Sequence, residues 1–142
     1  MSTLEKAKRL LAEGDYTCVF CKDETVLTSR RRGVAPLLDL LDEGGGVKGF
    51  SAADKVVGKG AAFLYVLLGV KELYAAVISA GALDVLKGYG VFVKYGILTD
   101  AIRNRDNTGF CPIETAVQSA ASPVQALAAI RCRLEEMKRQ GL

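Results

Sequence analysis

The sequence contains no histidine, and this absence limits its chemistry more than any other feature of the composition. Histidine is the usual general base and the commonest metal ligand in proteins. Aromatic residues are also scarce, at 7% of the 142 residues, and the formal net charge is only +3. Nucleic-acid-binding proteins usually combine a stronger basic bias with exposed aromatic side chains. We therefore expect neither a metal cofactor nor a nucleic-acid partner, and interpret the basic cluster at 30–32 as a solvated surface.

Long hydrophobic runs are absent as well. The longest apolar stretch, residues 60–70, is far shorter than the ~20 residues that a helix needs to cross a bilayer. The first nine residues lead into a charged amphipathic helix and do not resemble a signal peptide. Half of the residues are hydrophobic and a quarter are charged, a balance typical of globular proteins. These observations predict one cytoplasmic domain over residues 1–142, with no membrane partner.

The four cysteines include one C-x-x-C pair, Cys18 and Cys21. This motif is found in zinc sites and in redox proteins. Here it lies within residues 16–22, a segment with the composition of a strand. Positions three apart in a regular strand point to opposite faces, so the two thiols would diverge and could not share a metal ion or a disulfide. We interpret both as structural residues, and Cys132 as a packing residue of the C-terminal helix.

Hydrophobic periodicity and turn residues predict an alternation of helices and strands. The strands 73–78 and 91–95 flank a short helix, a βαβ order that implies parallel pairing. The sequence thus predicts an α/β fold with three α/β/α layers and a mixed sheet. Helices are expected at residues 2–12, 34–42, 51–68, 80–87, 112–120 and 122–140, and strands at 16–22, 25–30, 73–78 and 91–95.

The segment 51–68 has the strongest helical pattern. Ser51 and Asp54 have the spacing of a capping box, which would place Asp54 in the first turn. The second half, residues 60–68, is apolar on all sides, which predicts a buried helix. Lys55 and Lys59 are four residues apart, so they would share one face of this helix. Two interpretations of these lysines remain open: a solvated face, or a pair of cations around an anionic ligand.

The predicted order of elements over residues 2–96 resembles that of cytidine deaminases. In those enzymes a His/Cys-Ala-Glu motif begins the long helix and Pro-Cys-x-x-Cys begins the next, and together they hold a catalytic zinc ion. The matching segments here, 53–59 and 78–82, contain no such ligands. Ser79 and Ala82 stand where the two cysteines of the second motif would be. The absent ligands argue against zinc-dependent deamination.

Two further stretches, 54–59 and 109–114, are similar to the pattern of a small prokaryotic family of unknown function. The resemblance implies a cytidine-deaminase-like fold without the zinc motifs. It implies no particular activity, because one fold can carry many functions.

Cys111 is the cysteine best placed for chemistry. Pro112 suits the first position of a helix, which makes Cys111 the N-cap, although cysteine is not a preferred capping residue. Amides at a helix N-terminus favour the reactive thiolate. Glu114 could close a capping box, bind a substrate or transfer a proton. A small packing residue is the alternative for Cys111.

These residues suggest a site for a small anionic or nucleotide-like ligand between two helix starts. Cys111 and Glu114 are its candidate catalytic groups. The expected ligand-binding residues are Asp54, Lys55, Lys59, Ser79, Arg103, Asn107 and Thr108. The alternative is a non-catalytic ligand-sensing or oligomerisation module, with residues 60–68 and the arginine-rich C-terminal helix as interfaces. The sequence leaves open whether the protein is an enzyme.

Overall fold

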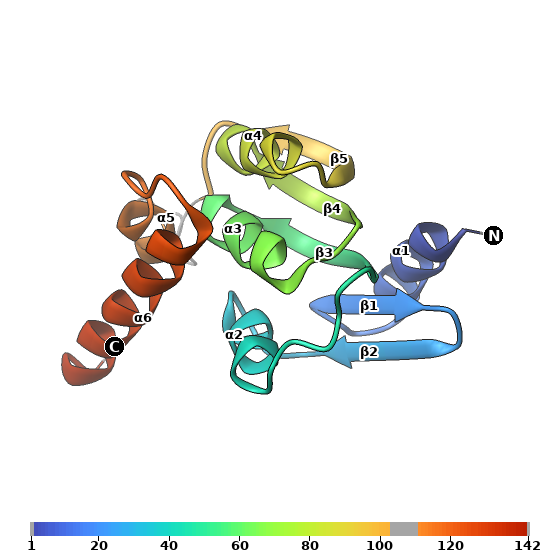
Figure 1. Cartoon of the computed structure of the whole chain (residues 1–142), viewed down its shortest axis with the longest axis horizontal. Helices are drawn as coiled ribbons and strands as arrows, with labels where there is room; N and C mark the ends of the chain where they lie inside the picture. The colour runs from blue at the N-terminus through green and yellow to red at the C-terminus, as the bar shows by residue number, and fades with distance from the viewer. Residues whose placement is uncertain (1, 103–110, 142) are drawn as a thin grey trace.

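The computed structural model describes residues 2–102 and 111–141 (Figure 1). Its centre is a five-stranded sheet in the order β2-β1-β3-β4-β5. β1 pairs antiparallel with both β2 and β3, whereas β3, β4 and β5 run parallel. The mixed sheet and the parallel pairing of the last two strands confirm the prediction. The strands are β1 (Cys18–Lys22), β2 (Thr25–Ser29), β3 (Ser51–Val57), β4 (Glu72–Ser79) and β5 (Phe92–Thr99).

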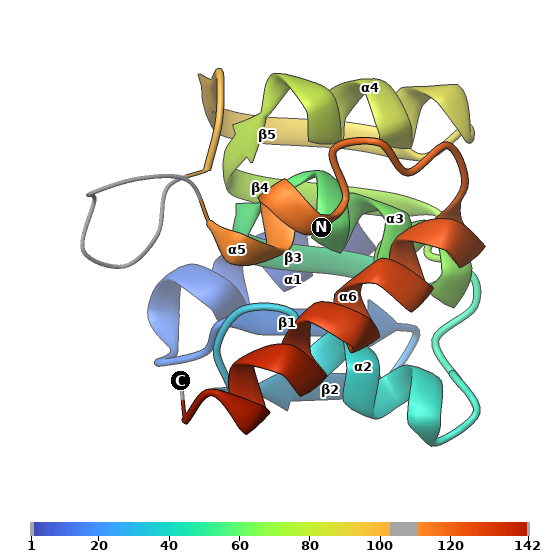
Figure 2. The same cartoon turned by 90° about the vertical axis from the view of Figure 1, so that its left-hand side faces the viewer.

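Helices cover both faces of this sheet, giving the predicted three layers. α1 packs on one face against β1, β3 and β4. α2, α3 and α4 lie on the other face, and α6 crosses the outer side of α3 (Figures 1 and 2). The helices of the described residues are α1 (Thr3–Glu13), α2 (Ala35–Asp42), α3 (Lys59–Leu68), α4 (Ala80–Gly88), α5 (Pro112–Ala116) and α6 (Pro123–Arg139).

The helix predicted at 51–68 is wrong in its first half. Residues 51–57 form the strand β3, and the helix α3 begins only at Lys59, after the N-cap Gly58. The expected capping box does not form. Instead, the Ser51 hydroxyl donates a hydrogen bond to the carboxylate of Glu72 on β4. Since β3 has a hydrogen-bonded neighbour on each side, pairing within the sheet outweighs the local preference of this segment for a helix.

The second half of the predicted helix is buried, as expected, but it offers no surface for oligomerisation. α3 packs against α2, α4 and α6 within the same chain, so the prediction of an interface at 60–68 is wrong. Gly60 permits the close approach of α5, because a Cβ at this position would lie 2.8 Å from Cγ2 of Ile113. The buried residues of α3 are Gly60, Ala61, Ala62, Phe63, Leu64, Tyr65 and Leu68.

The two cysteines of the C-x-x-C pair diverge as predicted. Cys18 joins the core between the sheet and α3, whereas Cys21 joins the smaller core beneath α1. Both are free, buried thiols. Their packing on opposite faces of β1 confirms the structural interpretation.

The strand β5 is longer than predicted, and the helix α5 is shorter. β5 continues to Thr99, and α5 ends at Ala116. Across the described ranges, no helix combines the length and the apolar character needed to cross a membrane.

Candidate functional site

A cavity of about 290 Å³ lies at the carboxyl end of β3. In α/β sheets, ligands bind in crevices outside the carboxyl ends of parallel strands. Residues of β1, β3, α3 and α5, together with the start of α2 and the segment that precedes it, form most of its walls. Most of the wall is apolar, including Val34, Pro36, Val56, Ala61, Ile102 and Ile113; its charged residues are Arg32, Asp54, Lys55 and Glu114.

Asp54 contributes a carboxyl group that is hydrogen-bonded to a buried residue of the core. Its Oδ2 accepts a hydrogen bond of 2.6 Å from the hydroxyl of Tyr65, a fully buried residue of α3. Its Oδ1 accepts a longer bond, 3.3 Å, from the backbone N–H of Val56. Asp54 therefore does not cap a helix, as the sequence had suggested, because it lies on β3 and points toward the side of α3.

The environment of Asp54 favours its protonated form. Burial raises the pKa of Asp54 to about 6, although its hydrogen bonds from Tyr65 and the backbone act in the opposite direction. Burial also raises the pKa of the neighbouring Cys18 thiol far above its usual range, and the nearby Asp54 charge adds to this effect. The pKa of Tyr65 is raised for the same two reasons. Cys18 is therefore a neutral wall residue.

Glu114 links the short helix α5 to the start of α3. Its Oε1 accepts a hydrogen bond of 2.8 Å from the backbone N–H of Lys59, and its Oε2 accepts one of 3.0 Å from Gly60. These amides are among the N–H groups that a helix cannot satisfy itself. Gly58 allows the contact, because a Cβ there would lie 2.3 Å from Oε1 of Glu114. Of the roles that the sequence left open for Glu114, a capping box within its own helix does not form, and the carboxylate caps α3 instead.

Cys111 is the N-cap of α5, as predicted, with Pro112 at the first helical turn. It is partly exposed and lines the cavity. Its backbone N–H donates a 3.2 Å hydrogen bond to the carbonyl oxygen of Ile102. α5 spans five residues, so it aligns fewer peptide dipoles behind this thiol than the longer helix we expected.

The two lysines do not share a helix face, because Lys55 lies on β3 and Lys59 is the first residue of α3. Lys55 is exposed and lines the cavity. Lys59 is not among the lining residues, and its Nζ donates a 3.1 Å hydrogen bond to the carbonyl oxygen of Gln118. The prediction that both lysines share one helix face is wrong, because the residues expected to form the first turns of the helix form the strand β3.

Ser79 is buried at the end of β4 and caps α4, with its Oγ accepting a 3.2 Å hydrogen bond from the N–H of Ala82. It does not line the cavity. The remaining predicted ligand-binding residues, Arg103, Asn107 and Thr108, lie outside the described residues.

Arg32 is the charged residue of the cavity wall that was not predicted from the sequence. Within its cluster, Arg31 pairs with Asp39 and Arg30 lies over the ring of Tyr16, with 4.9 Å between the guanidinium carbon and the ring centroid. Arg32 lines the cavity. Three adjacent arginines carry no periodic signal that would distinguish the one at a site from the two at the surface.

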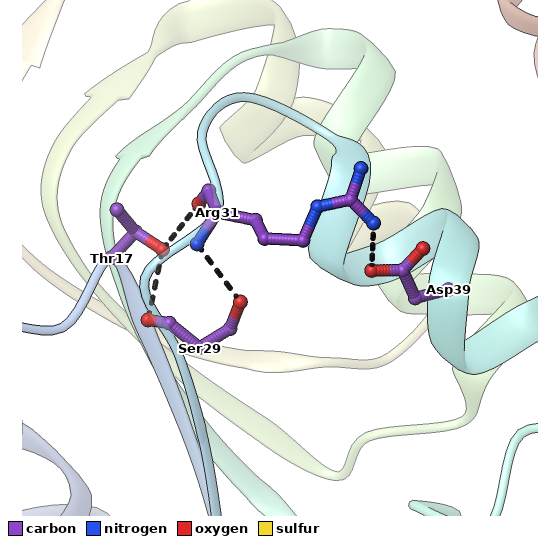
Figure 3. Close-up of polar contacts among 4 residues, drawn as sticks. All are labelled: Thr17, Ser29, Arg31 and Asp39. Carbon is purple, nitrogen blue, oxygen red and sulfur yellow. Dashed lines mark hydrogen bonds and ion pairs between the residues drawn. The ribbon is translucent and has the colours of Figure 1, made fainter.

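Thr17, also missed, holds the segment that carries Arg32. Figure 3 shows its hydroxyl between the carbonyl oxygens of Ser29 and Arg31, at 3.0 Å from the former. The N–H of Arg31 in turn donates a 3.1 Å hydrogen bond to Oγ of Ser29. These contacts fasten the chain leaving β2 to the start of β1, beside the cavity. Within the described ranges, no three His, Cys, Asp or Glu side chains are grouped so as to hold a metal ion.

Comparisons with known proteins match the chain over almost its whole length. Residues 6–134 match the family model described as TM1506, a domain of unknown function (DUF1893). The crystal structure of a DUF1893 family protein (TM1506) from Thermotoga maritima is similar, with a TM-score of 0.82 and 25% sequence identity. The match covers 94% of this chain and 89% of that one. A search of curated proteins found no match. The deaminase-like part of the resemblance stays a prediction, whereas the family match is direct: the chain belongs to the DUF1893 family.

Proposed function

We propose that this protein binds a small anionic molecule, of which nucleotides are one class, in the cavity at the carboxyl end of β3. One observation carries the proposal. Arg32 and Lys55 both line this mostly apolar cavity, and no carboxylate among the described residues lies within 4.0 Å of either cationic group. Two such cations beside one concave surface favour a ligand that supplies the negative charge.

The size and lining of the cavity limit the ligand further. Small-molecule sites usually measure about 300–1,000 Å³ and combine apolar walls with a few polar groups. At about 290 Å³, this cavity is near the lower end of that range. It suits one ring or a short apolar body, with the anionic group near the two cations.

The geometry supports binding better than catalysis. Glu114, the candidate proton-transfer group beside Cys111, is engaged by two backbone amides of α3. The chain has no histidine to act as the usual base for a cysteine nucleophile. Cys111 is therefore most useful as a reporter of ligand binding at this cavity.

A thermal-shift screen with nucleotides, nucleosides and phosphorylated metabolites tests the proposal. A ligand at a hundred times its dissociation constant stabilises a protein by roughly 2.7 kcal/mol. We expect Lys55→Ala and Arg32→Ala each to weaken a stabilising compound about fivefold or more. Lys71→Ala is the matched control, because the exposed Lys71 precedes β4 at the amino end of the parallel strands, opposite the end that carries the cavity. Equal ligand responses in all three variants would count against this cavity.

Assembly of two copies is a second candidate function, favoured by the edge strand β5. It pairs with β4 on one side only, within the described residues. Edge strands with apolar side chains readily pair with another chain, and an antiparallel pair of β5 strands would be self-complementary. Ile97→Lys should then lower the mass measured by light scattering, whereas a monomeric wild type at high concentration would remove this candidate. The exposed apolar residues of β5 are Phe92, Tyr95, Ile97 and Leu98.

A further inference from the structure

The cavity carries charges of opposite sign at two different depths. Asp54 is partly buried, and its carboxyl contacts the fully buried Tyr65. Arg32 and Lys55 are exposed residues of the same lining. Asp54 therefore marks the floor of the cavity, and the two cations mark its mouth.

The two cations do not neutralise this carboxylate. Neither lies within 4.0 Å of it, and no other lysine or arginine of the described ranges does. A carboxylate has about four lone-pair sites. The side chain of Asp54 uses one for Tyr65 and one, at 3.3 Å, for the N–H of Val56, and the backbone of Lys55 adds a weaker contact. Acceptor capacity thus remains on a charged group beside an open volume.

Within the site proposed above, on which this inference rests, we propose that the ligand is amphoteric. An N–H donor group, amidine-like or amino, meets Asp54 at the floor, and an anionic group meets Arg32 and Lys55 at the mouth. The apolar body between them lies against Val56 and Ile113 of the wall. Tyr65 holds Asp54 in place, so the carboxylate is oriented before the ligand arrives.

Three aromatic probes of similar size separate the two poles of such a ligand. 4-Carboxybenzamidine carries both an N–H donor pole and an anion, 4-acetylbenzoate keeps only the anion, and benzamidine keeps only the donor pole. Calorimetric titration at pH 8 should show 4-carboxybenzamidine binding at least about tenfold more tightly than either of the others, because charge-assisted hydrogen bonds form at both ends.

Asp54→Asn tests whether Asp54 binds the N–H donor group of the ligand. It keeps the shape of the side chain and an oxygen for the Tyr65 hydroxyl, but it replaces one acceptor by an N–H₂ group. The preference for 4-carboxybenzamidine over 4-acetylbenzoate should vanish in this variant. The affinity of 4-acetylbenzoate should be unchanged or higher.

The pH dependence of the wild-type protein tests the same point without a variant. Because the pKa of Asp54 is about 6, its charge is lost below that pH, and the preference for the amidine probe should decline from pH 8 to pH 5. Cys18 and Tyr65, which face the carboxyl group, have raised pKa values and stay neutral over this range. Arg32, Lys55, Cys111 and Glu114 also line the cavity, and 4-acetylbenzoate controls for any effect of theirs.

The results distinguish the amphoteric ligand from the proposed binding of a small anionic molecule. Equal binding of 4-carboxybenzamidine and 4-acetylbenzoate by the wild type would overturn the amphoteric ligand but leave an anion site intact. A preference that survives in Asp54→Asn, or that is constant from pH 8 to pH 5, would also overturn it. Failure of both probes to bind would contradict the proposed function itself.

Discussion

The hydroxyl of Tyr65 donates a 2.6 Å hydrogen bond to the carboxylate of Asp54, which joins the buried side of α3 to the strand β3. The two residues lie on either side of the turn at Gly58, so this bond fixes how the strand leads into the helix. It also keeps a titratable group at the floor of the cavity. The stability of the fold and the proposed binding are therefore both linked to the protonation of Asp54.

This linkage predicts a pH-dependent effect of Asp54→Asn. The pKa of Asp54 is raised from 3.8 in the unfolded chain to about 6 in the fold, so its contribution to stability is present at low pH and is lost as pH rises through 6. Relative to the wild type, the variant should gain on the order of 2 kcal/mol between pH 4 and pH 8. Urea unfolding at both pH values measures this difference. A variant effect that is the same at pH 4 and pH 8 would contradict the linkage.

Removal of the Glu114 carboxylate should loosen α5. Glu114→Ala leaves the N–H groups of Lys59 and Gly60 without their partner, which predicts a loss of about 1–3 kcal/mol in the free energy of unfolding. Glu135→Ala, at an exposed position of α6, is the control and should change stability by less than about 0.5 kcal/mol. Hydrogen exchange at Lys59 and Gly60 should accelerate in the first variant only. Equal stability of the two variants would show that the cap contributes nothing.

Gly58→Ala tests the close approach at the same turn. The added Cβ would lie 2.3 Å from Oε1 of Glu114, so one of the two must shift, at a cost of about 1–3 kcal/mol. The cost should fall when Glu114 is already alanine, because the clashing atoms are then absent. A double-mutant cycle of unfolding free energies measures this coupling. Additive effects would mean that Gly58 is required for another reason.

Local sequence patterns were most reliable where a helix start could be identified from its own residues. Ser2 and Ser122 both accept hydrogen bonds from the N–H three residues further on, and the helices that follow begin within about one residue of the predicted positions. Cys111 was identified as an N-cap because Pro112 suits a first turn. These signals depend only on neighbours along the chain.

The strand β3 could not be predicted in the same way. Its residues Ser51, Ala52 and Ala53 suit a helix locally, and Asp54 completes the spacing of a capping box. The pairing with β1 and β4 that makes it a strand depends on segments about 20 to 35 residues away. The part that Thr17 and Arg32 play in the cavity was missed for the same reason, since they lie beside the predicted site residue Asp54 only through this pairing.

Thr17→Val tests whether the contacts of Figure 3 position Arg32. Loss of the hydroxyl removes the link to the carbonyl oxygens of Ser29 and Arg31, which predicts a loss of about 1 kcal/mol in stability. Anion affinity should fall as well, because the segment that carries Arg32 is less firmly held. Thr25→Val, at an exposed position of β2, should affect neither. Unchanged anion affinity in Thr17→Val would remove this positioning role.

The alkylation rates of two cysteines show whether a small anionic molecule occupies the cavity. Cys111 lines the cavity and Cys132 is exposed on α6, whereas Cys18 and Cys21 are buried. Iodoacetamide labelling of the wild type is followed by mass spectrometry, with and without the compound that stabilises it most. If the cavity binds this compound, labelling of Cys111 should slow and labelling of Cys132 should be unchanged. An unchanged rate at Cys111, with the compound bound at saturation, would contradict binding in this cavity.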